Sequence, residues 1–226
     1  PKADKIIGIS KKLSNDLKKF INKNVTTIYN PAFDKSIYRL AKKKVHLTNK
    51  SDFIINVSRF TKRKDHRTTL LAFNEIAKIS KKLKLVLIGY GPEMKNIINL
   101  SKLLNIKNKV IIIEKCSNPY PYIKKAKLLI HTSVYEGFCN VLVEGIMLNT
   151  PVISTNCNAG PSEILLNGRG GDLINIGDFK SLAKNIKKFL KNSKKLKDKT
   201  KVSKKNLERF EVKTNVKKYS YIFEKI

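Results

Sequence analysis

The sequence predicts an α/β fold, a doubly wound parallel sheet preceded by a small and incomplete N-terminal remnant. Short apolar runs recur from residue 51 onwards, and each is followed by a segment in which apolar residues recur at helical spacing. Gly, Pro and Asn residues separate these segments. Strands that alternate with helices form a parallel sheet with helices on both faces, and such a sheet binds ligands beyond the carboxyl ends of its strands.

The first fifty residues predict a short strand over residues 3–9, a helix over 11–22 that Ser10 caps, and a second strand over Val25–Tyr29. Residues 32–50 are polar and rich in Lys, and we expect a linker with one helical turn. This stretch is too short to bury a core of its own. We therefore interpret residues 1–31 as the tail of a domain that begins further upstream.

The main domain is predicted over residues 51–192, and residues 193–226 are expected to be mostly helical. Apolar runs predict its strands, and the near-continuous apolar character of Val110–Ile113 is typical of a strand covered on both faces. The predicted strands are Phe53–Val57, Leu85–Ile88, Val110–Ile113, Leu128–Ile130, residues 151–154 and Gly171–Ile174. The predicted helices cover residues 66–80, 92–104, 118–125, a segment that starts at Gly137 and Phe138, a turn at 163–166, and 178–191.

The composition is that of a packed but very basic protein. Apolar residues make up 41% of its 226 residues, and 48 Lys and Arg against 17 Asp and Glu give a net charge of +31. Either an anionic partner, such as a membrane surface or nucleic acid, or a compositional bias towards Lys explains this charge. The three cysteines lack paired spacing, which indicates reduced thiols and a cytoplasmic location. No apolar run is long enough to span a bilayer, and we expect no signal peptide.

Two acids, Glu136 and Glu144, are separated by seven residues around a predicted helix start. The free N–H groups at a helix start suit a phosphate. Glu144 lies in an apolar stretch, where an ionised carboxylate is costly unless something bonds to it, and a pair of sugar hydroxyls would do so. An exposed Glu on an amphipathic helix is the simpler alternative.

The loops that follow successive strands place cations, glycines and acids on one rim. Arg59 and Lys64 follow the first strand of the main domain, Gly89 follows the second, and Glu114 the third. Arg and Lys bind phosphate, and glycines let the backbone approach a ligand closely. Each charge alone is more typical of a solvated side chain. Their position at strand ends favours a site for a diphosphate with an attached sugar and ribose.

Other site chemistries fit less well. Gly89 and Gly91 lack the third glycine of a dinucleotide-binding loop, and no phosphate-binding P-loop motif is present. His46, His66 and His131 are scattered and lack metal-ligand spacing, so we expect no metal site. His131 ends a buried strand, and we interpret it as a core residue with a satisfied hydrogen bond.

These motifs resemble the family-four retaining glycosyltransferases, which use nucleotide sugars and have the GT-B fold. The resemblance is strong over about residues 51–190 and weak at both flanks. The segment with Glu136 and Glu144 is the most specific. The matching segments are Asn56–Arg59 with Lys64, Ile88–Pro92, Asn118–Tyr120, Ser133–Phe138 with Glu144, Thr150–Thr155 and Gly160–Ile164.

The resemblance implies a role for each matching position. Arg59 and Lys64 would hold the donor diphosphate and stabilise the leaving group, Glu136 would lie near the donor sugar, and Glu144 would bind the ribose hydroxyls. Residues 113–117 would frame the base. The remaining positions expected to contact the donor are Gly89, Glu114, Cys116, Gly137, Phe138, Cys139, Val141 and Leu142. Neither a metal ion nor a cofactor is expected.

The resemblance also implies partners and a location. The expected reaction moves a sugar, with retention, from a UDP- or GDP-sugar to a lipid-linked or glycan acceptor in bacterial surface polysaccharide or lipopolysaccharide synthesis. Residues 1–31 would be the tail of the acceptor domain, and 51–192 the donor-binding domain. The protein would be cytoplasmic and could lie on the inner face of the plasma membrane, and nucleic acid is not expected as a partner.

Three departures from the family pattern matter. Glu114 stands where the family often has Gly, Gly145 stands where it usually has Ala, and the resemblance implies that most of the family's first domain is absent. We therefore expect the chain alone to bind donor without transferring sugar. The alternatives are a decayed nucleotide-binding fragment, a related epimerase or a basic nucleic-acid-binding module.

Overall fold

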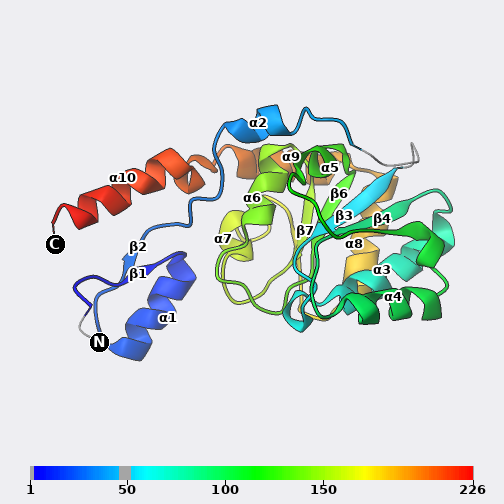
Figure 1. The fold of residues 1–226 in the computed structure, drawn as a ribbon, viewed down its shortest axis with the longest axis horizontal. Coiled ribbons are helices and arrows are strands. Elements are labelled where there is room, and N and C mark those ends of the chain that lie inside the picture. The colour runs from blue at the N-terminus through cyan, green and yellow to red at the C-terminus, as the bar shows by residue number, and fades with distance from the viewer. Residues whose placement is uncertain (1–2, 46–51, 226) are drawn as a thin grey trace.

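The computed structural model describes residues 3–45 and 52–225. Its main feature is a six-stranded sheet in the order β5-β4-β3-β6-β7-β8, in which every neighbouring pair is parallel (Figure 1). The order reverses direction between β3 and β6. The predicted doubly wound parallel sheet is thus confirmed. The strands are β3 Phe53–Val57, β4 Lys84–Ile88, β5 Val110–Ile113, β6 Leu128–His131, β7 Val152–Thr155 and β8 Asp172–Ile174.

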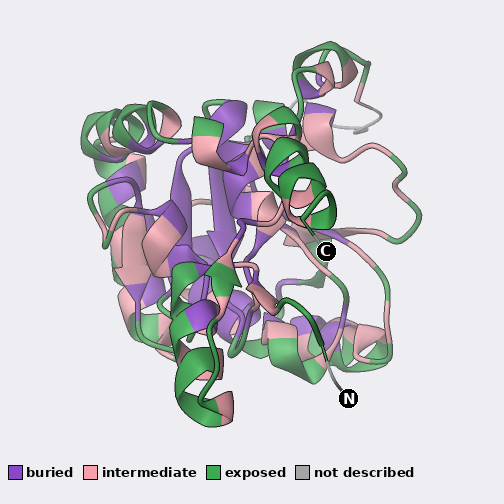
Figure 2. Cartoon of the chain, turned by 90° about the vertical axis from the view of Figure 1, so that its left-hand side faces the viewer, coloured by how far each residue is buried: buried purple, intermediate pink, exposed green. Residues whose placement is uncertain are grey.

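Helices cover both faces of this sheet, so the strands lie buried between two apolar layers (Figure 2). Successive residues of β3 belong to opposite layers, with Ile54 in one and Ile55 in the other. One layer receives α3 His66–Ile79, α4 Met94–Leu103 and α8 Phe179–Lys191. The other receives α5 Tyr120–Lys125, α6 Asn140–Met147 and α7 Pro161–Ile164. The shorter and C-terminal elements are η1 Lys62–Lys64, η2 Lys107–Lys109, α9 Lys194–Lys204, η3 Glu208–Phe210 and α10 Val212–Phe223.

Two predicted features of the main domain differ in the structure. β5 is an edge strand whose four residues are all only partly buried, so the expected full cover on both faces is wrong. Helix α6 begins at Asn140 and not at Gly137 or Phe138, because Cys139 takes a left-handed conformation with φ of 87° just before it. Gly137–Cys139 therefore forms a loop that leads into the helix.

The N-terminal remnant forms a two-stranded parallel sheet, β1 Ile7–Gly8 and β2 Thr26–Thr27, connected by α1 Lys11–Ile21. Both strands are shorter than predicted. The Ser10 hydroxyl accepts a hydrogen bond from the Leu13 N–H, which confirms the predicted cap. The predicted helical turn in the linker is α2 Ser36–Leu40. Residues 46–50 of the linker, which include His46, lie outside the described residues.

Contacts with α6 and with the C-terminal segment hold the end of this remnant, and the linker residues that follow it, on the main domain. Tyr29 and Phe33 pack in the same apolar layer as α6. Backbone hydrogen bonds of 2.9 Å connect Ala32 N to Phe210 O and Val212 N to Phe33 O. In Figure 1 the remnant lies on the same side of the sheet as α10. No helix within the described ranges combines the length and apolar character that a membrane span requires.

Candidate functional site

The carboxyl ends of β3, β4 and β5 enclose a hollow of about 610 Å³. It brings together four of the residues predicted to contact a ligand, namely Arg59, Gly89, Glu114 and Cys116. Gly89 has φ of 151°, and a Cβ added there would lie 1.9 Å from the Ser58 carbonyl oxygen. Only glycine fits this close approach of two strand ends. The hollow is therefore built by the backbone as well as by side chains.

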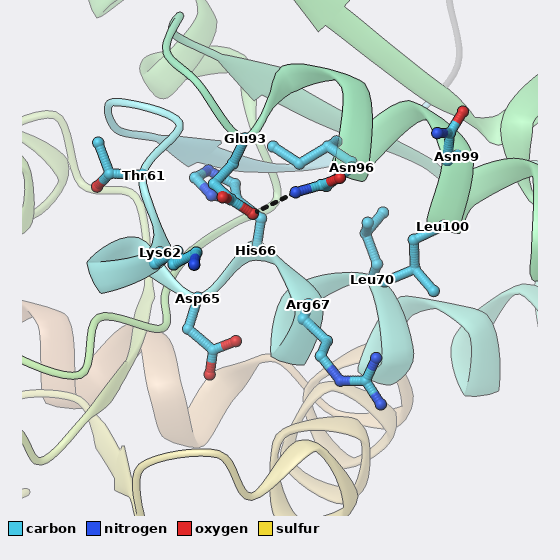
Figure 3. Close-up of a pocket in the computed structure, with 11 residues that line it drawn as sticks. Thr61, Lys62, Asp65, His66, Arg67, Leu70, Glu93, Asn96, Asn99 and Leu100 are labelled. Atoms are coloured by element: carbon cyan, nitrogen blue, oxygen red, sulfur yellow. Dashed lines mark hydrogen bonds between the residues drawn. The ribbon is translucent and has the colours of Figure 1, made fainter.

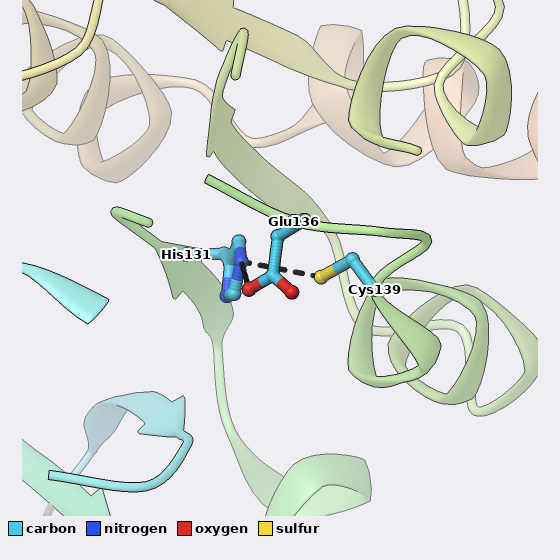
Figure 4. A group of neighbouring side chains, drawn as sticks. All are labelled: His131, Glu136 and Cys139. Atoms are coloured by element: carbon cyan, nitrogen blue, oxygen red, sulfur yellow. Dashed lines mark hydrogen bonds and ion pairs between the residues drawn. The ribbon is translucent and has the colours of Figure 1, made fainter. Parts of the chain in front are cut away.

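A second cluster surrounds Glu136 at the end of β6 (Figure 4). The Lys64 ammonium forms a salt bridge with Oε1 of Glu136. The same oxygen lies 3.0 Å from His131 Nε2 and accepts a 2.7 Å hydrogen bond from the Ser133 hydroxyl. Cys139 Sγ lies 3.2 Å from His131 Nε2. The structure thus places two predicted residues, Lys64 and Glu136, in direct contact.

The loop that carries Lys64 is held against the end of β6 by hydrogen bonds. The Thr132 hydroxyl lies 3.0 Å from the carbonyl oxygens of both Lys64 and Asp65. The Val134 N–H donates to the carbonyl oxygen of Arg63 at 2.8 Å. These contacts fix the base of the lysine side chain relative to Glu136.

Burial and hydrogen bonding act in opposite directions on the charge of Glu136. Burial alone would raise the pKa of this carboxyl, but the contacts with His131 and Lys64 outweigh it and lower the pKa to about 2. Burial lowers the pKa of His131, so its ring is neutral at pH 7. Glu136 is consequently ionised, and the positive partner that faces it is Lys64.

The pKa of Glu144, on α6, is shifted in the opposite direction to that of Glu136. Burial raises the pKa of its carboxyl to about 7. Among the described residues none makes a hydrogen bond to this carboxylate. Burial, and after it the charges of Glu144 and Asp34, raise the pKa of the nearby Tyr120 hydroxyl. A half-buried acid without a partner is costly unless a ligand with hydroxyl groups binds to it.

The other residues predicted to contact the donor differ in how far they are buried and in what they pack against. Gly137 lies next to Ile9 of the N-terminal remnant. Phe138 is 3% exposed and packs against Tyr29 and Phe210, so its side chain belongs to the core. Val141 is partly buried, whereas Leu142 is fully buried and donates its N–H to the Cys139 carbonyl oxygen. Their roles toward a donor stay predictions.

Two features of the site were not predicted from the sequence. His131 is buried, as expected, but its partner is the site carboxylate of Glu136 and not a core group. Ser133 also bonds to this carboxylate. The only hint in the sequence is that both residues follow the end of a buried strand within five residues of Glu136.

The ligand atoms of His131, Glu136 and Cys139 all lie within 4.8 Å of one another, a grouping that could hold a metal ion. Lys64 and Ser133 already bond to Oε1 of Glu136, so a cation at this oxygen would have to displace the lysine. The expectation that the site needs no metal stays a prediction.

A separate hollow of about 350 Å³ lies between η1, the start of α3 and α4 (Figure 3). Glu93 and Asn96, which hydrogen bond at 3.0 Å, line one side, and Lys62 and Arg67 line another. His66 also lines it, but its Nδ1 atom is enclosed and has no partner among the described residues. None of the predicted site residues lines this hollow.

Comparison with known proteins agrees with this geometry. The family model "Glycosyl transferases group 1" matches residues 39–206. An N-acetylgalactosaminyltransferase of Campylobacter jejuni that acts on a diphospho-undecaprenol-linked sugar is 31% identical over 197 residues, which cover 86% of this chain and 53% of that protein. The capsular polysaccharide biosynthesis glycosyltransferase CapM of Staphylococcus aureus is 31% identical over 150 residues, covering 65% of this chain and 39% of CapM.

The fold also matches solved structures. HepE of Anabaena, solved in complex with UDP-glucose, superposes with a TM-score of 0.87 at 20% identity, covering 99% of this chain and 64% of HepE. The chain spans about half the length of the curated relatives it matches. The sheet is the Rossmann-like sheet of a GT-B domain. Because the family model matches most of the length of this chain, the chain belongs to the group 1 glycosyl transferases, a family with members in bacterial polysaccharide synthesis.

Proposed function

We propose that the main domain binds the nucleotide-sugar donor, a UDP- or GDP-sugar, of a retaining glycosyltransferase. The observation that carries the proposal is the carboxylate of Glu144, to which no described residue bonds, near the Lys64–Glu136 pair and a hollow of suitable size. In this assignment the base lies in the hollow beside Glu114 and Cys116, and Glu144 accepts hydrogen bonds from the ribose hydroxyls.

Arg59 and Lys64 would bind the diphosphate. Arg59 is exposed at the rim of the hollow, and Lys64 already contacts an anion, the Glu136 carboxylate. A donor phosphate would compete for the same ammonium or share it. As the bond between sugar and phosphate breaks, negative charge builds up on the leaving group, and the two cations would stabilise it electrostatically. Glu136 would then face the sugar.

The acceptor is proposed to be a lipid-linked or other glycan. The Campylobacter relative acts on a lipid-linked sugar, which supports a lipid-linked acceptor, and CapM acts in capsular polysaccharide biosynthesis, which supports a role in surface polysaccharide synthesis. The net charge of +31 would hold the enzyme against anionic lipid at the inner face of the plasma membrane. Because the chain spans about half of these relatives, we expect it to bind donor without catalysing transfer by itself.

Thermal unfolding with a panel of nucleotides tests the donor assignment. UDP, GDP and ADP and their sugars are added to the chain, each in large excess. A ligand present at about 100 times its dissociation constant adds roughly 2.7 kcal/mol of stability. We expect stabilisation by UDP or GDP compounds and little by ADP. Absence of any shift with every nucleotide would overturn the assignment.

A further inference from the structure

The Glu136 carboxylate is held from one side only. Three donors converge on its Oε1 atom, from Lys64, His131 and Ser133. Its Oε2 atom accepts no hydrogen bond from any residue in the described part of the chain. One oxygen is therefore fixed by the protein, and the other remains available for a ligand.

Two of these donors, Lys64 and His131, differ in how firmly the fold holds them. Lys64 lies on a short 3₁₀ segment, and its ammonium group is at the end of a long flexible side chain. The proposed function assigns this ammonium group to the donor phosphate. His131 is the last residue of β6, which pairs with β3 on one side and β7 on the other, and it is 2% exposed. The imidazole is thus the more rigid support of the carboxylate.

The direction of the contact between His131 and Glu136 follows from chemistry. An ionised carboxylate can only accept a hydrogen bond, so His131 Nε2 must carry the proton and donate it. Cys139 Sγ, 3.2 Å from the same nitrogen, can then act only as a weak second acceptor. Hydrogen bonds to an ionised acceptor are among the stronger ones in proteins, which suits a contact that sets an orientation.

We propose that His131 is a positioning residue, which fixes Glu136 so that its Oε2 atom faces the donor sugar after Lys64 has turned to the phosphate. This inference rests on the proposed function, because it needs a sugar to bind at Glu136. It concerns only the sugar half of the donor. The affinity for the nucleotide half should not depend on it.

The test compares two ligands in each variant. For UDP and UDP-N-acetylglucosamine, and in parallel for GDP and GDP-mannose, calorimetry gives the ratio of the dissociation constant of the sugar nucleotide to that of the free nucleotide. We expect His131→Leu to raise this ratio about tenfold with little change for the free nucleotide, as for one lost charge-assisted contact. In His131→Gln, which retains an N–H donor, the ratio should stay close to its wild-type value.

Two further variants separate positioning from general damage. Thr150→Val removes a buried hydrogen bond of 2.7 Å to the Ile123 carbonyl oxygen, away from Glu136, and should leave the ratio unchanged. In a double-mutant cycle, His131→Leu should have no further effect on the ratio once Glu136→Gln is present. Additive effects of the two substitutions, or an unchanged ratio in His131→Leu, would overturn the inference.

A measurement without ligand distinguishes the two proposals. The carboxyl ¹³C signal of Glu136 is titrated by NMR, and in His131→Leu its pKa should be higher than in the wild type. If this shift appears but no nucleotide binds to the wild type, the contact stands and the proposed function fails. If nucleotides bind and the carboxyl titrates identically in both proteins, the positioning role is wrong and the proposed function stands.

Discussion

Replacement of Glu144 by glutamine should stabilise the ligand-free protein and weaken its binding of nucleotide. Burial raises the pKa of this carboxyl from 4.5 to about 7. At about 1.4 kcal/mol per pKa unit, ionisation of the buried group costs at most about 3.5 kcal/mol. Glutamine has nearly the same shape and no charge, so Glu144→Gln should remove most of that cost at pH 8 and little of it at pH 4.

The sign follows from proton binding. The folded protein binds the Glu144 proton more tightly than the unfolded chain does, so this residue stabilises the fold at low pH. That contribution is lost as the pH rises from about 4.5 to about 7, and it changes little above. Urea unfolding of wild type and variant at several pH values measures it. The free energy of unfolding of the variant relative to wild type should increase across this range.

Ligand binding should change in the opposite direction. A carboxylate can accept hydrogen bonds from both ribose hydroxyls, whereas the glutamine amide offers one acceptor oxygen. Glu144→Gln should therefore weaken nucleotide binding about tenfold while it stabilises the empty protein. Glu75→Gln is the matched control, because Glu75 is on the exposed side of α3 and pairs with Lys78. A variant with the wild-type pH dependence, or one less stable than wild type at pH 8, would refute the reasoning.

Three further outcomes are expected. Gly89→Ala should abolish nucleotide binding and lower the melting temperature, because its Cβ would lie 1.9 Å from the Ser58 carbonyl oxygen, and a normal melting curve with retained binding would contradict this. Glu163→Ala should destabilise the protein by about 1 kcal/mol in urea unfolding, because the Glu163 carboxylate accepts hydrogen bonds from Lys11 N at 3.1 Å and Lys12 N at 2.9 Å at the start of α1, and no change would show that this cap is unimportant. The protein should sediment with phosphatidylglycerol vesicles but not with phosphatidylcholine vesicles, and equal recovery with both lipids would argue against anionic lipid as its partner.

The sequence was sufficient for the sheet, because strands buried on both faces produce apolar runs that stand out from the Lys-rich surface. Such runs do not reveal the order of the strands in the sheet. Val110–Ile113 is as apolar as the central strands, yet it lies at the edge, since its position depends on long-range pairing. The start of α6 was misplaced for a local reason, the left-handed conformation of Cys139, which residue types alone do not reveal.

The candidate site was predictable to the same degree. Arg59, Gly89, Glu114 and Cys116 could be grouped because parallel strands end on the same edge, and the structure does bring them to one hollow. The contact between His131 and Glu136 could not be predicted, because the orientation of a side chain at a strand end depends on the packing around it. That no residue in the described ranges bonds to the Glu144 carboxylate is likewise visible only in three dimensions.

The backbone hydrogen bonds between Ala32 and Phe210 and between Phe33 and Val212 have a consequence for synthesis on the ribosome. The N-terminal remnant emerges before the sheet, but the segment that completes its docking emerges only after it. The sheet from β3 to β8 can assemble in between, because all its strands lie within residues 53–174. Until Val212 has left the exit tunnel, Tyr29 and Phe33 lack part of their apolar cover, and this is when a nascent chain would be most exposed to chaperones and proteases.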